Sequence, residues 1–120
     1  MKKITVILIL IGIVAVLTAV FFIFNKSNPG NNKLDDFAKC LASKNIVMYG
    51  TPWCEWCQKE KALFSNSFKF INYIDCSQKS QDCVAKNISR TPTWIFSDGS
   101  RIEEYQTVEQ LSQESGCALP

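Results

Sequence analysis

The hydrophobic residues of this chain fall into one long uninterrupted run followed by several short ones. The long run, residues 4–24, holds no charged residue and follows Lys2 and Lys3. As a helix, about 21 residues would cross a hydrocarbon core of roughly 30 Å. The pattern predicts a membrane anchor over residues 1–24. A cleaved signal peptide is the alternative, but its apolar region usually spans about 7–15 residues, and Phe21–Phe24 would make a poor cleavage site.

The remaining sequence predicts a linker and one domain. Residues 25–33 are polar and contain Pro and Gly, as linkers do, and residues 34–120 form the predicted domain. Within the domain, short apolar runs typical of strands alternate with segments of helical period. The expected elements are a helix over Leu34–Lys44, a strand over Ile46–Gly50, a helix over Gln58–Phe64, a strand over Phe68–Asp75, a short helix within Ser77–Lys86, a strand over Thr93–Phe96, a turn at Asp98-Gly99, a return strand over Arg101–Tyr105 and a final helix that opens at Thr107 with a capping-box pattern. This order predicts an α/β fold with a central mixed sheet flanked by helices.

Two cysteines, Cys54 and Cys57, stand where the first predicted strand gives way to a helix. The free N–H groups at a helix N-terminus favour negative charge, so a thiolate at Cys54 would be stabilised there. The thiolate is the nucleophile of disulfide exchange. Cys57 lies one turn further into the helix and would be the more buried, resolving thiol. The pair therefore predicts a redox-active disulfide with Cys54 as its nucleophile.

The Cys54–Cys57 pair allows two other interpretations. Such a pair is also half of a zinc site, but the chain has no His, and the spacing of Cys76 and Cys83 lies outside the common ligand spacings. A purely structural disulfide is the second alternative, although such a small ring closes little chain entropy. We therefore expect neither a metal nor an organic cofactor.

The composition of the chain indicates the compartment of the domain and argues against nucleic acid as a partner. The chain has 13 basic and 11 acidic residues. Apart from Lys2 and Lys3, the two signs balance, so there is no basic excess to indicate nucleic-acid binding. Six cysteines without His indicate disulfides in an oxidising compartment. We expect a single-pass protein of the cell membrane with a cytoplasmic N-terminus and an extracytoplasmic domain.

Several motifs carry a resemblance to a known family. The sequence Trp53-Cys54-x-x-Cys57 after a strand, with Thr91-Pro92-Thr93 ahead of a hairpin, is similar to the thioredoxin superfamily. The match is closer to the thioredoxin-like domain fused to bacterial and plant homologues of vitamin K epoxide reductase. That closer resemblance rests on Phe37-Ala38-x-Cys40-Leu41, Val47–Gly50, Cys57-Gln58, Leu63-Phe64, Asn72-Tyr73-Ile74-x-Cys76, Pro92-Thr93-Trp94 and the ending Leu111–Cys117. It implies a thioredoxin-like fold, while the multi-span reductase would have to be a separate protein.

The resemblance also implies roles for residues around the cysteines. Pro92 would be cis and face Cys54, and the backbone of Thr91 would pair with a substrate peptide; an ordinary strand-leading proline is the alternative. Trp53 would be an apolar lid or an ordinary packing residue, and Trp56 would be exposed and touch a partner. Thioredoxin has a buried carboxylate in the strand before its motif, which this strand lacks, so proton transfer to Cys57 would need water or Glu55.

The other four cysteines are expected to be structural, and they allow three pairings. Cys76 ends a predicted strand and Cys83 lies in the next segment, close enough to pair locally. Cys40 and Cys117 would then join the two ends of the domain. A second redox relay at Cys76–Cys83 is the rival interpretation.

These observations predict a membrane-anchored, extracytoplasmic thiol–disulfide oxidoreductase. It would form disulfides in exported client proteins through Cys54 and Cys57, and a quinone-linked homologue of vitamin K epoxide reductase would reoxidise it. A disulfide reductase or isomerase, including one in cytochrome maturation, is one alternative. A non-catalytic thioredoxin-like binding module is another.

Overall fold

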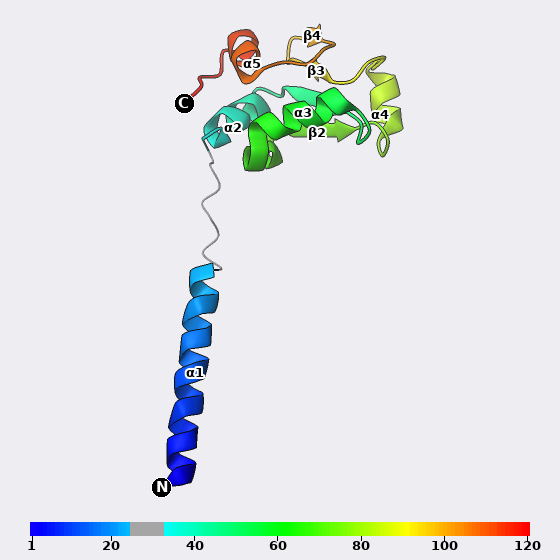
Figure 1. The fold of residues 1–120 in the computed structure, drawn as a ribbon. Helices are drawn as coiled ribbons and strands as arrows, with labels where there is room; N and C mark the ends of the chain where they lie inside the picture. Colours follow the sequence, from blue (N-terminus) through cyan, green and yellow to red (C-terminus); the bar gives the residue numbers. More distant parts are fainter. Residues whose placement is uncertain (25–32) are drawn as a thin grey trace. The chain divides into compact units, whose positions relative to one another are not determined.

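The computed structural model describes residues 1–24 and 33–120 (Figure 1). The chain divides into two units, an N-terminal helix and a domain, and each is described by itself. The predicted linker, residues 25–33, lies outside the described residues except for Lys33.

Helix α1 spans Lys2–Phe24 and is apolar on all sides after its first two residues. Its 23 residues would extend about 35 Å at a rise of 1.5 Å per residue. Residues 2–22 are long and apolar enough to cross a membrane, judged by length and composition.

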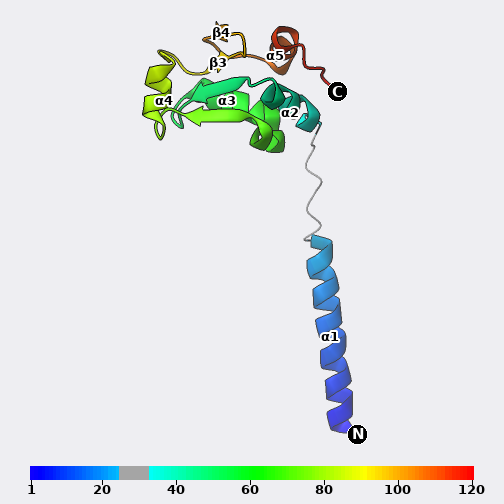
Figure 2. The same cartoon turned by 180° about the vertical axis from the view of Figure 1, so that it is seen from behind.

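The domain is built on a four-stranded mixed sheet in the order β2-β1-β3-β4. Strand β1 (Val47–Gly50) runs parallel to β2 (Asn72–Asp75), and β3 (Thr93–Ile95) pairs antiparallel with β1 and with β4 (Arg101–Ile102). A parallel pair needs a crossover connection, which α3 (Glu55–Phe64) supplies. This helix lies in front of β2 in Figure 1 and behind it in Figure 2, so it covers one face of the sheet.

Five helical segments surround the sheet: α2 (Asp35–Ser43), α3 (Glu55–Phe64), the 3₁₀ helix η1 (Ser65–Phe70), α4 (Ser80–Ala85) and α5 (Val108–Ser115). The predicted capping box opens α5, since Thr107 Oγ1 accepts from the Gln110 backbone N–H at 3.2 Å and the Gln110 side chain accepts from the Thr107 N–H at 2.9 Å. The expected mixed sheet with flanking helices is confirmed. Its core contains the fully buried side chains Trp94, Phe37, Phe64, Leu41, Met48 and Leu111.

The predicted strand over 68–75 was wrong in its first part. Phe68 and Phe70 alternate with Lys69 as in a strand, yet residues 65–70 form η1. Ser67 is buried there and its hydroxyl donates to the Asp35 carboxylate at 2.6 Å, which fixes this turn to α2. Phe68 stacks edge-on with Phe64. Tertiary contacts thus override the alternation of apolar and polar residues that predicted a strand here.

The return strand is shorter than predicted. It ends at Ile102, and the chain leaves the sheet before Tyr105. The Tyr105 ring instead packs on Trp56, with ring centroids 5.4 Å apart. The course of the chain after β4 brings residues 103–105 next to the start of α3.

Candidate active site

The Cys54–Cys57 disulfide sits at the N-terminus of α3, directly after the loop that follows β1. Cys54 is the N-cap residue, and its sulfur accepts a hydrogen bond from the Cys57 backbone N–H at 3.1 Å. Cys57 is fully buried, whereas Cys54 is partly exposed. Only the Cys54 side of the disulfide is therefore open to an incoming thiol.

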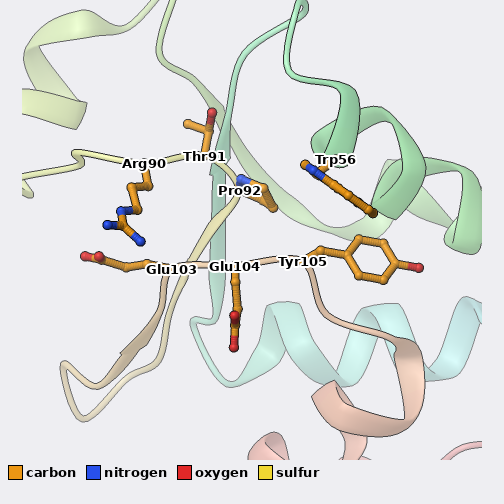
Figure 3. Close-up of a pocket in the computed structure, with 7 residues that line it drawn as sticks. All are labelled: Trp56, Arg90, Thr91, Pro92, Glu103, Glu104 and Tyr105. Atoms are coloured by element: carbon orange, nitrogen blue, oxygen red, sulfur yellow. The ribbon is translucent and has the colours of Figure 1, made fainter.

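A pocket of about 560 Å³ lies beside this helix start. Figure 3 shows Pro92 in its centre, with the Trp56 and Tyr105 rings to one side and Arg90 and Glu103 to the other. The Thr91–Pro92 peptide bond is cis, and Pro92 is buried. The lining comes from α3, from the segment before β3 and from the segment after β4: Trp56, Arg90, Thr91, Pro92, Glu103, Glu104 and Tyr105.

The two tryptophans beside the cysteines differ in their surroundings. Trp56 is 52% exposed, packs on Tyr105 and carries the Lys59 ammonium 4.1 Å from its ring centroid. Trp53 is 76% exposed and does not line the pocket. Such exposure does not fit a core-packing role for Trp53, so it presents an apolar surface to solvent next to Cys54.

Glu55, between the cysteines, is exposed and paired. Its carboxylate lies 2.9 Å from Lys59 Nζ, and the hydrogen bond from Lys59 lowers the pKa of Glu55. The carboxylate therefore stays ionised, and the neighbouring ammonium offsets part of its effect on a thiolate at Cys54.

Glu60 is a buried carboxylate that the sequence analysis missed. It is fully buried on α3, one turn after Cys57, and accepts hydrogen bonds from the Trp94 indole N–H at 3.1 Å and from the Gln106 backbone N–H. Burial raises the pKa of Glu60 to about 7, although both hydrogen bonds act in the opposite direction. Its three-residue spacing from Cys57, on the same helix face, was the available signal. Glu60 ties α3 to β3 and to the segment before α5.

We expect Glu60 to make stability depend on pH. Its folded pKa is about 7 and its usual value is 4.5, so a stabilising contribution is fully present below about pH 4.5 and is lost as pH rises through about 7. The two values differ by an amount equivalent to about 3 kcal/mol. Glu60→Gln keeps an acceptor oxygen but cannot ionise, so this loss should disappear. Urea unfolding of the oxidised full chain in detergent, at pH 5 and pH 8, measures the difference.

The control for this experiment is Glu114→Gln, which removes an exposed carboxylate from α5. It should follow the wild-type change with pH. An identical change for Glu60→Gln and wild type would contradict the assignment of this titration to Glu60.

The four remaining cysteines form two further disulfides. Cys40 on α2 is joined to Cys117, after α5, with Cα atoms 5.9 Å apart. Cys76, after β2, is joined to Cys83 on α4, with Cα atoms 5.7 Å apart. Both bonds lie apart from the pocket lining.

The strand order, the Cys-x-x-Cys motif at the N-terminus of the crossover helix and the cis proline before β3 together define a thioredoxin-like fold with a redox motif at its usual place. No family model matches the chain. The chain is similar to thiol-disulfide oxidoreductase LTO1 of Arabidopsis thaliana, with 31% identity over 91 residues. The match covers 68% of this chain and 24% of that protein, so the chain spans about a quarter of the length of this relative.

Solved structures with a similar course of the chain include two redox proteins. The oxidised thioredoxin of Plasmodium falciparum is 18% identical, with a TM-score of 0.47, and the match covers 68% of this chain and 90% of that one. The glutaredoxin of Methanosarcina mazei is 21% identical, with a TM-score of 0.44, and covers 59% of this chain and 77% of that one. The fold assignment rests on the strand order and on the position of the cysteines.

Proposed function

We propose that this protein is a membrane-anchored thiol–disulfide oxidoreductase that forms disulfides in exported proteins. The observation that carries the proposal is the asymmetry of the Cys54–Cys57 disulfide, which exposes one sulfur at a helix N-terminus and buries the other. The similarity to an enzyme named as a thiol-disulfide oxidoreductase supports it.

The proposed reaction has two exchange steps. A client thiolate attacks the Cys54 sulfur, the Cys54–Cys57 bond breaks, and Cys57 leaves with the electron pair as a thiolate. A second client thiolate then attacks the client sulfur of the mixed disulfide and releases Cys54 as a thiolate. The client has lost two electrons and gained a disulfide, and the protein holds a dithiol. No organic cofactor takes part.

The pocket beside the start of α3 is the proposed place for the client chain. The backbone of Thr91 would pair with an extended client segment, and Pro92 would hold that segment opposite Cys54. Trp56 and Tyr105 offer a side chain of the client an aromatic surface, and Trp53, the residue before Cys54, adds exposed apolar area outside the pocket lining. Mostly apolar pockets with a few polar groups are typical of binding sites.

The anchor and the compartment are further parts of the proposal. Helix α1 would cross the cell membrane once, with Lys2 and Lys3 on the cytoplasmic side and the domain outside the cytoplasm. The two disulfides at Cys40–Cys117 and Cys76–Cys83 support an oxidising compartment. A separate membrane protein similar to vitamin K epoxide reductase would accept the two electrons and pass them to a quinone.

Oxidation of clients is the proposed direction because the effect of a membrane electron acceptor outweighs the effect of the residues next to Cys54. The Glu55 carboxylate next to Cys54 disfavours the thiolate, which favours an only moderately oxidising couple. A membrane partner that withdraws electrons can nevertheless keep a moderate couple oxidised by kinetics. A reductase, as in cytochrome maturation, would reverse the flow of electrons, an isomerase would rearrange client disulfides without net electron transfer, and a non-catalytic module would exchange no thiols.

The test follows the redox state of Cys54 and Cys57 by alkylation. The oxidised full chain in detergent, mixed with a reduced unfolded client, should become a dithiol as the client gains a disulfide. The double variant Cys54→Ser/Cys57→Ser should leave the client reduced. An equally inactive wild type would indicate a binding module. In intact cells quenched with acid, a pair found mainly as disulfide supports the oxidant, and a pair found mainly as dithiol would indicate a reductase.

A further inference from the structure

Gly50, the last residue of β1, leaves a small space next to the buried sulfur of Cys57. A Cβ atom on Gly50 would lie 3.0 Å from Cys57 Sγ and also 3.0 Å from the Tyr73 hydroxyl oxygen. The sulfur and the hydroxyl therefore approach the same point from two elements, α3 and β2. Glycine is the residue that leaves this point free.

The Tyr73 hydroxyl has an unused hydrogen-bonding capacity at this place. Within residues 1–24 and 33–120, it is one of two buried side-chain oxygens without a hydrogen-bond partner, the other being Thr51 Oγ1. A buried hydroxyl without a partner costs free energy and calls for an explanation. In the disulfide form Cys57 carries no charge and is at best a weak acceptor.

The Tyr73 ring is held in this position by contacts from two sides. Lys61 Nζ, also on α3, lies 3.8 Å from the centroid of the ring, and the Phe68 ring packs against it edge-on at 5.4 Å. Tyr73 also pairs with Met48 in the β1–β2 register, which places both on the same sheet face as Gly50. Packing thus holds the ring in a position where its hydroxyl oxygen and Cys57 Sγ border the same space at Gly50.

We propose that Tyr73 is a positioning residue for the redox reaction, whose hydroxyl donates a hydrogen bond to the Cys57 thiolate once the disulfide opens. This inference rests on the proposed function and adds a residue to the same site. When a thiolate attacks Cys54, the S–S bond breaks and the electron pair goes to Cys57, which becomes a buried anion. Burial without a partner would be costly for that anion, and a charge-assisted hydrogen bond reduces the cost. Tyr73 keeps its proton throughout.

The charged groups around this hydroxyl agree with a donor role. Burial raises the pKa of Tyr73, and the nearby Asp75 carboxylate raises it further, so the hydroxyl is protonated at neutral pH. Lys61 is the cation next to the ring, and burial lowers its pKa while Asp75 acts in the opposite direction. Glu60, on the same helix, is already engaged by Trp94 and Gln106. The hydroxyl is therefore the free donor at Cys57 among these groups.

The first experiment measures the pKa of the Cys57 thiol without any client. In full-length Cys54→Ser, Cys57 is a free thiol, and the ultraviolet absorbance of its thiolate can be followed against pH in detergent. Adding Tyr73→Phe should raise the pKa of Cys57 by about one to two units, a change of about ten- to a hundredfold in the acid dissociation constant. An unchanged pKa would overturn the proposal.

Two matched variants separate this role from a general effect of the substitution. Tyr49→Phe removes a hydroxyl from β1 on the opposite face of the sheet and should leave the pKa of Cys57 unchanged. Thr51→Val removes the other buried hydroxyl without a partner. A pKa that responds to Thr51→Val and not to Tyr73→Phe would overturn the assignment to Tyr73.

The second experiment compares rate and stability. Reduced glutathione should open the Cys54–Cys57 disulfide about tenfold more slowly in Tyr73→Phe, because the leaving thiolate has lost its donor. The oxidised variant should unfold at the wild-type temperature or above, since the hydroxyl has no partner to lose in that state. Slower opening together with an equal loss of oxidised stability would indicate a merely structural role and overturn the proposal.

The experiments distinguish a failure of the Tyr73 proposal from a failure of the proposed function. A wild type that does not exchange with clients, combined with the expected rise in the pKa of Cys57, would reject the function and leave the Tyr73 contact standing. Normal exchange with clients, combined with an unchanged pKa of Cys57, would reject the role of Tyr73 and leave the proposed function standing.

Discussion

The variant Cys57→Ser should accumulate in cells as mixed disulfides with client proteins, whereas Cys54→Ser should not. In Cys57→Ser the exposed thiolate at Cys54 still attacks client disulfides, but serine cannot resolve the product because its hydroxyl is far less acidic than a thiol. In Cys54→Ser the remaining thiol at Cys57 is fully buried and does not reach a client. We expect an excess of at least about tenfold in client-linked species, measured on non-reducing gels after acid quenching and alkylation.

The two variants are matched, since each removes one sulfur of the same disulfide and leaves Cys40–Cys117 and Cys76–Cys83 in place. Circular dichroism and protease resistance show whether both are equally folded. Trapping by Cys54→Ser with none by Cys57→Ser would reverse the assigned roles of the two cysteines.

Removing the Cys40–Cys117 disulfide, with both residues changed to alanine, should lower the free energy of unfolding by about 4 kcal/mol. The bond joins residues 77 apart, so in the chain-entropy model it restricts the unfolded chain over almost the whole domain. Cys117 is also buried in the core, next to the residues that α2 and α5 contribute. Urea unfolding of the full chain in detergent, followed by tryptophan fluorescence, gives the change.

The matched comparison is Cys76→Ala with Cys83→Ala, which opens a loop between residues only 7 apart. The same model expects a loss of about 2 kcal/mol there. Neither double variant should abolish exchange through Cys54. Loss of exchange in the Cys76/Cys83 variant while the domain stays folded would favour the rival interpretation, in which this pair is a redox relay.

Most of the fold was predictable because the local signals were strong and agreed with one another. The uncharged run over 4–24 predicts a long apolar helix, and the alternation of strands and helices predicts the mixed sheet. The Thr107–Gln110 pattern predicts the start of the last helix, since the capping box needs only residues of one turn. The disulfides are Cys54–Cys57, Cys76–Cys83 and Cys40–Cys117; the first two join cysteines close in the sequence, and the third joins the two that remain.

The boundaries that failed are those that tertiary contacts decide. Residues 68–70 alternate as in a strand, but the hydrogen bond from Ser67 to Asp35 and the stacking of aromatic rings hold them in a 3₁₀ helix. Likewise the return strand ends early because Tyr105 packs on Trp56, a residue far away in the sequence. No pattern within a short window carries information about such partners.

The sequence by itself determined the apolar N-terminal helix, the α/β order of the domain and the redox motif at a helix start, because each depends on residues within a few positions of one another. Only the tertiary structure decided what surrounds the buried sulfur. Glu60 receives its hydrogen bonds from Trp94 and Gln106, which belong to two other segments. The Tyr73 hydroxyl and the Cys57 sulfur border the same space because the parallel register of β1 and β2 places Tyr73 on the face of Gly50, which leaves that space open. Strand register and packing depend on the whole chain at once, so local sequence patterns could not predict the surroundings of the Glu60 carboxylate and the Tyr73 hydroxyl.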